Sequence, residues 1–207
     1  MKTPSPPAGL SRLRTERLDP LLERKLEEGF RRAAGSPAWR CRKLAEARDL
    51  CLLSQIAPAR RLAVLSLDFR EGLRAMLALR VPVPRRPAGE VSLVVDDLAV
   101  LGLTYPAEAI RMPQPGYRFV HVLSPSDVFH ANVAAGPVQA LCLGASLPAG
   151  IPVREIVLAA YGALSLQSVQ VDEYDPVGVL NVEAARWWQA NPSRIPLTRT
   201  PFLGEGA

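Results

Sequence analysis

Apolar residues recur at helical spacing near the start of the chain. They stand every four positions between Leu22 and Phe30, which places them on one face of a helix. Asp19 and Pro20 come directly before, as an N-cap and a first-turn proline. An amphipathic helix is therefore expected over residues 20 to 33.

A second helical pattern follows Gly35, which is a typical stop for the first helix. Ser36-Pro37 supplies another start signal, and Pro58 supplies the end. The apolar positions between them include Leu44, Leu52 and Ile56. The amino-terminal quarter of the chain is thus expected to be helical.

The apolar period then changes toward two. Leu77, Leu79, Val81 and Val83 alternate with other residues, as in a strand with one buried face. Further β-branched, apolar runs are separated by segments rich in Pro and Gly, which favour turns. These runs are residues 91–103 and 118–123, and residues 62–67 are compatible with either a strand or a helix.

Helical spacing returns in the last third of the sequence. Apolar residues after Pro152 predict one helix, and residues 182–189 predict another. The order is helices, then consecutive strands, then helices. That order predicts an α+β fold with an antiparallel sheet rather than alternating βαβ units.

Composition supports a folded chain. Of 207 residues, 48% are apolar and 22% are charged, a balance typical of globular proteins. The sequence contains no run of the roughly 18 to 20 apolar residues that cross a bilayer, and its start lacks a secretory apolar segment. A cytoplasmic location without membrane contact is the expectation.

Positive charge is concentrated toward the amino terminus. Residues 1–80 hold 17 Lys and Arg against 9 Asp and Glu, whereas residues 81–207 hold 8 against 11. Such a surface is typical of a solvated basic helix, and it is also compatible with an acidic protein partner. No recognised nucleic-acid motif accompanies the charge, so nucleic acid is not an expected partner.

The three cysteines, Cys41, Cys51 and Cys142, are odd in number and match no common zinc spacing. Neither a disulfide framework nor a metal or other cofactor is expected. Because Cys142 is flanked by Leu141 and Leu143, its simplest interpretation is a small buried residue. The surrounding sequence suggests more than that.

The segment HANVAAGPVQALCLG, residues 130–144, is expected to be a loop between the last strand and the carboxy-terminal helices. It reads His130-Ala131-Asn132, then Gly136, then Cys142-Leu143. This order resembles the ubiquitin-conjugating family, whose hallmark is His-Pro-Asn, a Gly-containing loop and a Cys-Leu pair.

The resemblance extends over roughly residues 75–190. Tyr105-Pro106 ends a strand before the hallmark, and Asp175-Pro176 precedes the next expected helix, as in the family. Ala131 replaces the hallmark proline, and LGASLPAGIP lacks the tryptophan usually found after the cysteine. In these departures the sequence resembles the divergent bacterial branches of the ubiquitin-conjugating family, which serve ubiquitin-like operons, some of them antiviral.

The resemblance implies a UBC-like fold, with a four-stranded antiparallel sheet flanked by amino- and carboxy-terminal helices. It divides the chain into a tail and helical extension, residues 1–58, and a UBC-like catalytic domain, residues 59–207. The expected partners are a ubiquitin-like modifier, an activating enzyme that contacts the basic amino-terminal helices, and a target protein.

The resemblance also implies roles for individual residues. Cys142 would carry the modifier as a thioester, since cysteine is both a nucleophile and a competent leaving group. Asn132 would donate to the oxyanion or brace the loop. Asp175 would gate the incoming lysine, with Asp172 and Glu173 as weaker substitutes, and it is equally compatible with an N-cap for the following helix. His130 would brace the site without acting as a base.

Three other functions remain open. The first is a catalytically inactive UBC-like module that only binds a modifier, which a buried and unreactive Cys142 would favour. The second is a cysteine hydrolase that pairs Cys142 with His121 or His130. The third is a nucleic-acid-binding protein that uses the basic helices.

Overall fold

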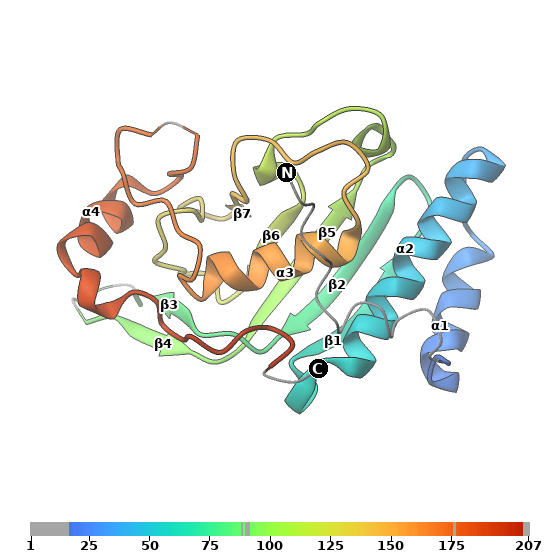
Figure 1. Ribbon diagram of the computed structural model, residues 1–207, viewed down its shortest axis with the longest axis horizontal. Helices are drawn as coiled ribbons and strands as arrows, with labels where there is room; N and C mark the ends of the chain where they lie inside the picture. The colour runs from blue at the N-terminus through green and yellow to red at the C-terminus, as the bar shows by residue number, and fades with distance from the viewer. Residues whose placement is uncertain (1–16, 88, 90–91, 176, 205–207) are drawn as a thin grey trace, which may run out of the picture.

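The computed structural model describes residues 17–87, 89, 92–175 and 177–204, and it has an α+β fold (Figure 1). Its centre is a five-stranded antiparallel sheet with the strand order β1-β2-β5-β6-β7, and β3 and β4 form a second, two-stranded sheet. The strands are β1 (Leu62–Asp68), β2 (Leu73–Leu79), β3 (Val83–Arg85), β4 (Val94–Asp96), β5 (Ala99–Tyr105), β6 (Val120–Ser124) and β7 (Gln139–Leu141). The helices are α1 (Pro20–Phe30), α2 (Pro37–Ile56), α3 (Val153–Leu164) and α4 (Val182–Ala190), with helical turns η2 (Pro58–Arg60), η3 (Ala107–Ile110), η4 (Gly116–Arg118) and η5 (Pro192–Arg194).

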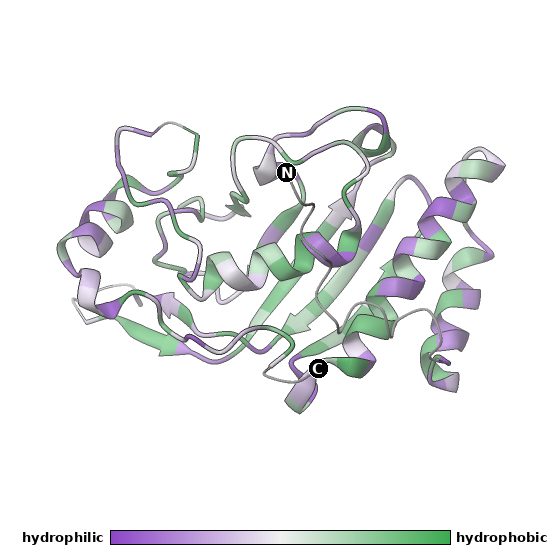
Figure 2. Ribbon diagram, in the orientation of Figure 1, coloured by the Kyte–Doolittle hydropathy of each residue, from purple (hydrophilic) through white to green (hydrophobic). Residues whose placement is uncertain are grey.

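The core lies between the sheet and the helices α2 and α3 (Figure 1). Side chains of β2 and β5 alternate between buried and more exposed positions, so each strand has one inward face. Leu77 and Leu101 are cross-strand partners on that face, and both are 1% exposed. Leu50 of α2 and Ile156 of α3 are fully buried against it. Figure 2 shows these apolar stretches in green along the central strands and α3.

The helix starts in the amino-terminal quarter are confirmed. The Asp19 carboxylate accepts a hydrogen bond from the Leu21 N–H at 2.8 Å, and the Ser36 hydroxyl accepts one from the Trp39 N–H at 3.3 Å. The first helix ends at Phe30, earlier than expected. Beyond it the chain turns, and the Ala34 N–H donates to the carbonyl of Phe69 at 3.4 Å, after β1.

The number of strands differs from the four expected. The segment expected to be a loop before Cys142 contains β7, which adds to β6 through the register His121↔Ala140. The alternation expected to continue through Val83 ends with β2, because the following segment carries prolines, which cannot donate within a central strand. That segment forms the separate β3-β4 pair, with Pro84 opposite Val95. The apolar run 91–103 divides accordingly into β4 and β5.

The expected boundary at residue 58 falls in η2, between α2 and β1. Residues on both sides of it belong to one apolar core, from Leu26 of α1 to Phe202 near the described carboxyl end. The segment after η5 crosses back beside α3 toward η2 (Figure 1). Its backbone is bonded there, since the Leu197 N–H donates to the Ser165 carbonyl at 3.0 Å and the Tyr161 hydroxyl to the Thr200 carbonyl at 2.8 Å.

A smaller apolar cluster holds α4 in place. Trp188 is fully buried in it, and its indole N–H donates to the Phe129 carbonyl at 3.0 Å. Asn181 caps the helix by accepting from the Ala184 N–H at 3.0 Å. The start of α4 is thereby fixed close to the segment that follows β6.

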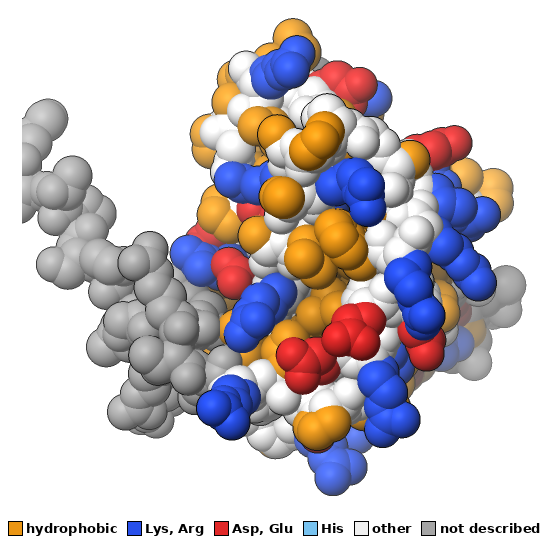
Figure 3. All heavy atoms as spheres, turned by 90° about the vertical axis from the view of Figure 1, so that its right-hand side faces the viewer, with side chains coloured by type: hydrophobic (Ala, Val, Ile, Leu, Met, Phe, Trp, Pro, Cys, Tyr) orange, Lys and Arg blue, Asp and Glu red, His pale blue; other side chains and the backbone are white. Residues whose placement is uncertain are grey.

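Charged side chains of both signs lie on the side of α1 and α2. Figure 3 views this side, where Lys and Arg side chains lie around a strip of apolar ones and Asp and Glu side chains lie at its lower part. Within the described residues, no helix is both long enough and apolar enough to cross a membrane.

Candidate functional site

Cys142 directly follows β7 and is tied to the segment that contains Asn132. The Cys142 N–H donates to the Asn132 carbonyl at 2.7 Å, and the Ala134 N–H donates to the Ala140 carbonyl at 2.9 Å. Residues 132–142 therefore form a loop that is closed by these two hydrogen bonds and includes Gly136. This closure brings together Asn132 and Cys142, which are ten positions apart in the sequence.

His130 lies beneath this loop and is fully buried. Its Nδ1 must be an acceptor, because it receives the Asn132 backbone N–H at 3.0 Å. Its Nε2 therefore carries the proton and donates to the Ala163 carbonyl of α3 at 2.8 Å. Burial lowers the pKa of His130 from 6.5 to about 4, despite the opposing effect of the Ala163 carbonyl. The imidazole is thus neutral near pH 7, with both nitrogens engaged in bracing.

The Asn132 side chain is also fully engaged. Its amide nitrogen donates to the Gln170 carbonyl at 3.0 Å and to the Gly178 carbonyl at 2.6 Å, while its oxygen accepts from the Gln170 N–H at 3.1 Å. These three bonds fasten the segment 170–178 to the loop that precedes Cys142. The contacts are those of a bracing residue, and donation to an oxyanion would require one of the two amide N–H bonds to be released.

Asp175 lies on the same segment and is half-buried. One carboxylate oxygen accepts from the Gln170 side-chain amide at 2.8 Å, and the other accepts from the Val177 N–H at 2.9 Å. Asp175 is not the N-cap of α4, because Asn181 has that place. The cap interpretation was wrong because the chain turns locally after Asp175, with a side-chain bond two residues on, and the helix begins later.

The two acidic neighbours of Asp175 have other partners. The Asp172 carboxylate accepts from the Tyr174 N–H at 3.1 Å, and Glu173 pairs with Arg186 of α4. Pro176, which follows Asp175 in the family pattern, lies outside the described residues.

The Cys142 side chain is 4% exposed. Its thiol donates to the Val177 carbonyl at 3.2 Å and lies 3.5 Å from the Gly144 carbonyl. Val177 belongs to the segment that Asn132 and Gln170 hold. The thiol therefore faces the backbone of this segment, which must shift before a large acyl donor can reach the sulfur.

A cavity of about 570 Å³ opens beside Cys142. The loop before Cys142, α3 and the segment after α3 form its walls. The α3 wall carries small side chains, which leave room for an extended chain. The lining residues are Asn132, Cys142, Leu143, Gly144, Leu158, Ala159, Gly162, Ala163, Gln167, Ser168, Val169, Gln170 and Gly178.

Gln170 and Gly178 were not identified from the sequence. A Cβ on Gly178 would lie 2.6 Å from Cγ of Gln170, so only glycine permits this contact. The Gln170 side chain also accepts from the Val171 N–H at 3.1 Å. A glycine soon after the Asp-Pro pair was the one local signal for such a close approach.

The two histidines are not bonded to the thiol. His121 lies on β6 and lines a hollow of the sheet with Met76 and Leu123. Both nitrogens of His130 are bonded to backbone groups, as described above. Within the described residues, the hydrogen bonds of the Cys142 thiol go to carbonyl oxygens. The geometry gives the hydrolase interpretation no support.

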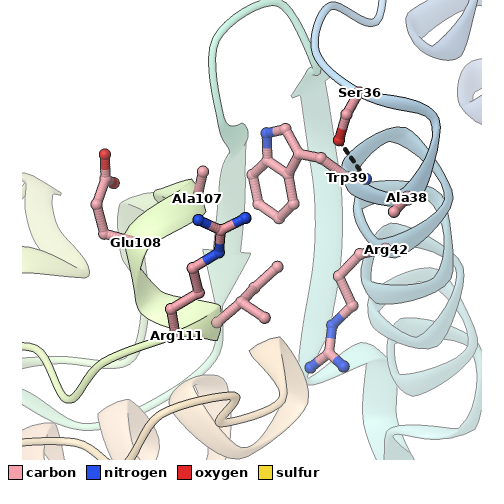
Figure 4. Close-up of a pocket in the computed structure, with 8 residues that line it drawn as sticks. Ser36, Ala38, Trp39, Arg42, Ala107, Glu108 and Arg111 are labelled. Carbon is pink, nitrogen blue, oxygen red and sulfur yellow. Dashed lines mark hydrogen bonds between the residues drawn. The ribbon is translucent and has the colours of Figure 1, made fainter.

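A second cavity, of about 470 Å³, lies between the first turns of α2 and η3. Figure 4 shows the Trp39 indole and the Arg111 side chain approaching each other across it, with Arg42 below. Arg42 pairs with Glu46 at 2.6 Å and donates to the Gly150 carbonyl at 3.1 Å. The cavity is thus an aromatic and basic hollow, separate in its lining from Cys142.

Comparison with protein-family models, with curated proteins and with solved structures gives no match.

Proposed function

We propose that this chain has a UBC-like fold and is a conjugating enzyme for a ubiquitin-like protein. Cys142 would accept the modifier from an activating enzyme as a thioester and transfer it to a target amine. One observation carries the proposal: Cys142 is bonded to Asn132 at the wall of an open cavity, and Gln170, which also lines that cavity, joins Asn132 to Asp175 by hydrogen bonds.

The chemistry fits these residue types. In loading, the Cys142 sulfur attacks the carbonyl carbon of the incoming thioester, and the thiol of the activating enzyme leaves. In discharge, an amine attacks the new thioester, an amide forms and the Cys142 thiol is released. An amine with a reference pKa of about 10.4 must lose its proton to attack. The Asp175 carboxylate would orient that amine and accept its proton as the nitrogen attacks the thioester carbonyl.

The cavity beside Cys142 suits an extended chain end. The α3 wall presents Ala159, Gly162 and Ala163, whose small side chains permit close approach of another backbone. The modifier's carboxyl-terminal tail would lie there and present its last carbonyl to the sulfur. The activating enzyme would contact the Lys and Arg side chains of α2 and of the turn after α1, on the side shown in Figure 3.

A second candidate is a catalytically inactive UBC-like module that only binds the modifier. The 4% exposure of Cys142 and its bond to the Val177 carbonyl favour this candidate. The two functions differ in whether the segment 170–178 moves to free the sulfur when partners bind.

Covalent loading separates the two candidates. The full chain is mixed with its cognate activating enzyme, modifier and ATP, and adducts are resolved with and without reductant. We expect an adduct that reductant removes, that Cys142→Ser converts to a stable ester or abolishes, and that Cys41→Ser leaves intact, since Cys41 is an exposed control thiol. No adduct, together with non-covalent modifier binding by the unmodified chain, would establish the inactive module instead.

A further inference from the structure

The cavity between α2 and η3 has an aromatic wall and a basic wall. Trp39 stands on the α2 side, and Ile110 and Arg111 stand on the η3 side. Figure 4 shows the Trp39 indole and the Arg111 side chain pointing toward each other from these opposite walls. The volume of the cavity is about 470 Å³, which lies within the range of small-molecule sites.

The Trp39 ring is held in a fixed orientation. Its indole N–H donates to the Glu71 carbonyl at 3.5 Å, and the ring centroids of Trp39 and Tyr105 lie 6.2 Å apart. A Cβ on Gly35 would lie 2.7 Å from Cδ1 of Trp39, so the ring takes this position only because residue 35 is glycine. Because the ring is partly exposed and already oriented, a flat ligand can stack on it with little rearrangement.

The two walls are joined through Gly150. Its N–H donates to the Ala109 carbonyl of η3 at 2.7 Å, and its carbonyl accepts from Arg42 of α2 at 3.1 Å. Arg42 is itself held by Glu46, one turn further along α2, at 2.6 Å. Since one residue is bonded to both walls, these contacts fix the width of the cavity between them.

The unpaired charge in this cavity comes from Arg111. The charge of Arg42 is offset by Glu46, and Glu108 points away from the cavity in Figure 4. Among the described residues, the exposed Arg111 side chain has no hydrogen bond, ion pair or ring contact. A free guanidinium offers planar donors that match a carboxylate or a phosphate. The cavity therefore favours an anionic group attached to a flat ring.

We propose that this cavity binds a small aromatic anion, a planar ring that carries a carboxylate or a phosphate. The ring stacks on the Trp39 indole, and the anionic group accepts hydrogen bonds from the Arg111 guanidinium. Ile110 adds an apolar contact on the η3 side. This inference rests neither on the thioester chemistry of Cys142 nor on a UBC-like fold.

Titration calorimetry on the intact chain tests the proposal. Naphthoate is a ring with a carboxylate, and adenosine monophosphate is a ring system with a phosphate. Naphthylmethanol supplies a neutral ring, and acetate and inorganic phosphate supply the anions without a ring. We expect saturable binding of at least one ring anion, about tenfold or more tighter than that of the neutral ring or the anion alone. The two ring anions distinguish a carboxylate ligand from a phosphate one.

Variants assign the binding to this cavity. Arg111→Gln should weaken it about tenfold, and Arg111→Lys, which keeps the charge without the planar donors, should weaken it less. Arg48→Gln removes another exposed arginine and should leave the affinity unchanged. In NMR spectra, the indole N–H signal that Trp39→Phe removes should shift when ligand is added to the unmodified chain, whereas the signals of the other two tryptophans should stay in place.

Thermal unfolding should show that Arg111→Gln is folded, because the side chain it replaces is exposed. The shift of the Trp39 signal is measured on the unmodified chain and so decides the matter even if that variant is unstable. The proposal is overturned if neither ring anion binds, if the neutral ring or the anion alone binds as tightly, if Arg48→Gln loses as much affinity as Arg111→Gln, or if the Trp39 signal does not move at saturation.

Discussion

Gln170 is the residue through which the candidate catalytic groups meet. Its backbone bonds to the Asn132 side chain in both directions, and its side-chain amide holds the Asp175 carboxylate. The same side chain accepts backbone N–H groups of residues 171 and 172. Gln170 therefore fixes the Asp175 carboxylate relative to the Asn132 side chain, and under the proposed function it would be a positioning residue rather than a catalytic one.

This arrangement predicts separate effects on loading and discharge. Asp175→Ala should leave formation of the Cys142 thioester close to that of the unmodified chain, while discharge to free lysine slows by roughly a hundredfold. Gln170→Ala should slow discharge in the same way, because it releases the carboxylate. Single-turnover assays with a preloaded thioester measure the two steps separately.

The double variant tests whether the two residues act together. If Gln170 acts through Asp175, the double variant should discharge no more slowly than Asp175→Ala alone. Additive losses would show that Gln170 has an independent role. Equal loss of loading and discharge in both single variants would indicate a folding role for the whole segment.

The buried His130 predicts an acid-sensitive fold. Its pKa is about 4 in the folded state and 6.5 as the reference value, so the folded state resists protonation. The neutral His130 imidazole contributes its full stabilisation of the fold above pH 6.5, and this stabilisation is lost as the pH falls toward 4. The loss should reach about 2 kcal/mol by pH 5. Urea unfolding across this range should show the decline, and His130→Gln should flatten it.

Glu46 has an opposing influence on that profile. Burial raises the pKa of Glu46, although the Val153 N–H and Arg42 lower it in part. A carboxyl whose pKa is raised in the folded state stabilises the fold at pH values below its unfolded-state pKa. This stabilisation is lost as the pH rises through the folded-state pKa. The decline assigned to His130 must therefore be measured as a difference between the unmodified chain and His130→Gln.

At the scale of elements, α3 receives its cap from another helix. Pro152 precedes α3 and offers no side-chain cap. Glu46 of α2 instead accepts the Val153 N–H at 2.6 Å, and Arg42 pairs with the same carboxylate. Because α3 forms one wall of the cavity beside Cys142, this contact links the packing of α2 to the candidate site.

Removing the cap should destabilise the chain. Glu46→Ala leaves the Val153 N–H buried without its acceptor, and we expect a loss of about 1 to 2 kcal/mol in the free energy of unfolding. Glu46→Gln keeps an oxygen acceptor and should lose less. Urea unfolding of both variants provides the comparison, and equal losses would show that charge pairing with Arg42 matters more than the cap.

At the scale of the whole molecule, the carboxyl-terminal segment closes the fold over α3. Phe202 is 5% exposed and packs edge-on against Tyr161, with ring centroids 5.4 Å apart. Arg61, just before β1, donates to the Pro201 carbonyl at 2.5 Å and also to that of Phe202. The end of the described chain is thereby fastened to the start of the sheet.

Loss of the Phe202 ring should test this closure. Phe202→Ala removes a buried aromatic side chain, and we expect destabilisation by about 3 kcal/mol. Leu203→Ala, at a neighbouring and more exposed position, is the matched control and should cost less. Calorimetric or urea unfolding measures both. Similar small losses in the two variants would show that the segment is only loosely attached.

The sequence by itself determined the features that depend on near neighbours. Asp19 and Ser36 cap helices because their side chains reach N–H groups two or three residues away. The alternation in β2 sets an inward face for the same local reason. The order of helices and strands was therefore sufficient to predict an α+β fold with an antiparallel sheet.

Only the tertiary structure decided the features that join distant residues. Asn132 meets Gln170 across 38 positions, and the Cys142 thiol meets the Val177 carbonyl across 35. Neither contact can be predicted from a pattern in the sequence, because every residue has a backbone carbonyl, whatever its side chain. The strand β7 likewise exists because β6 is available to pair with it. The sequence named Cys142 as the candidate thiol, and packing decided that it lies covered beside its cavity.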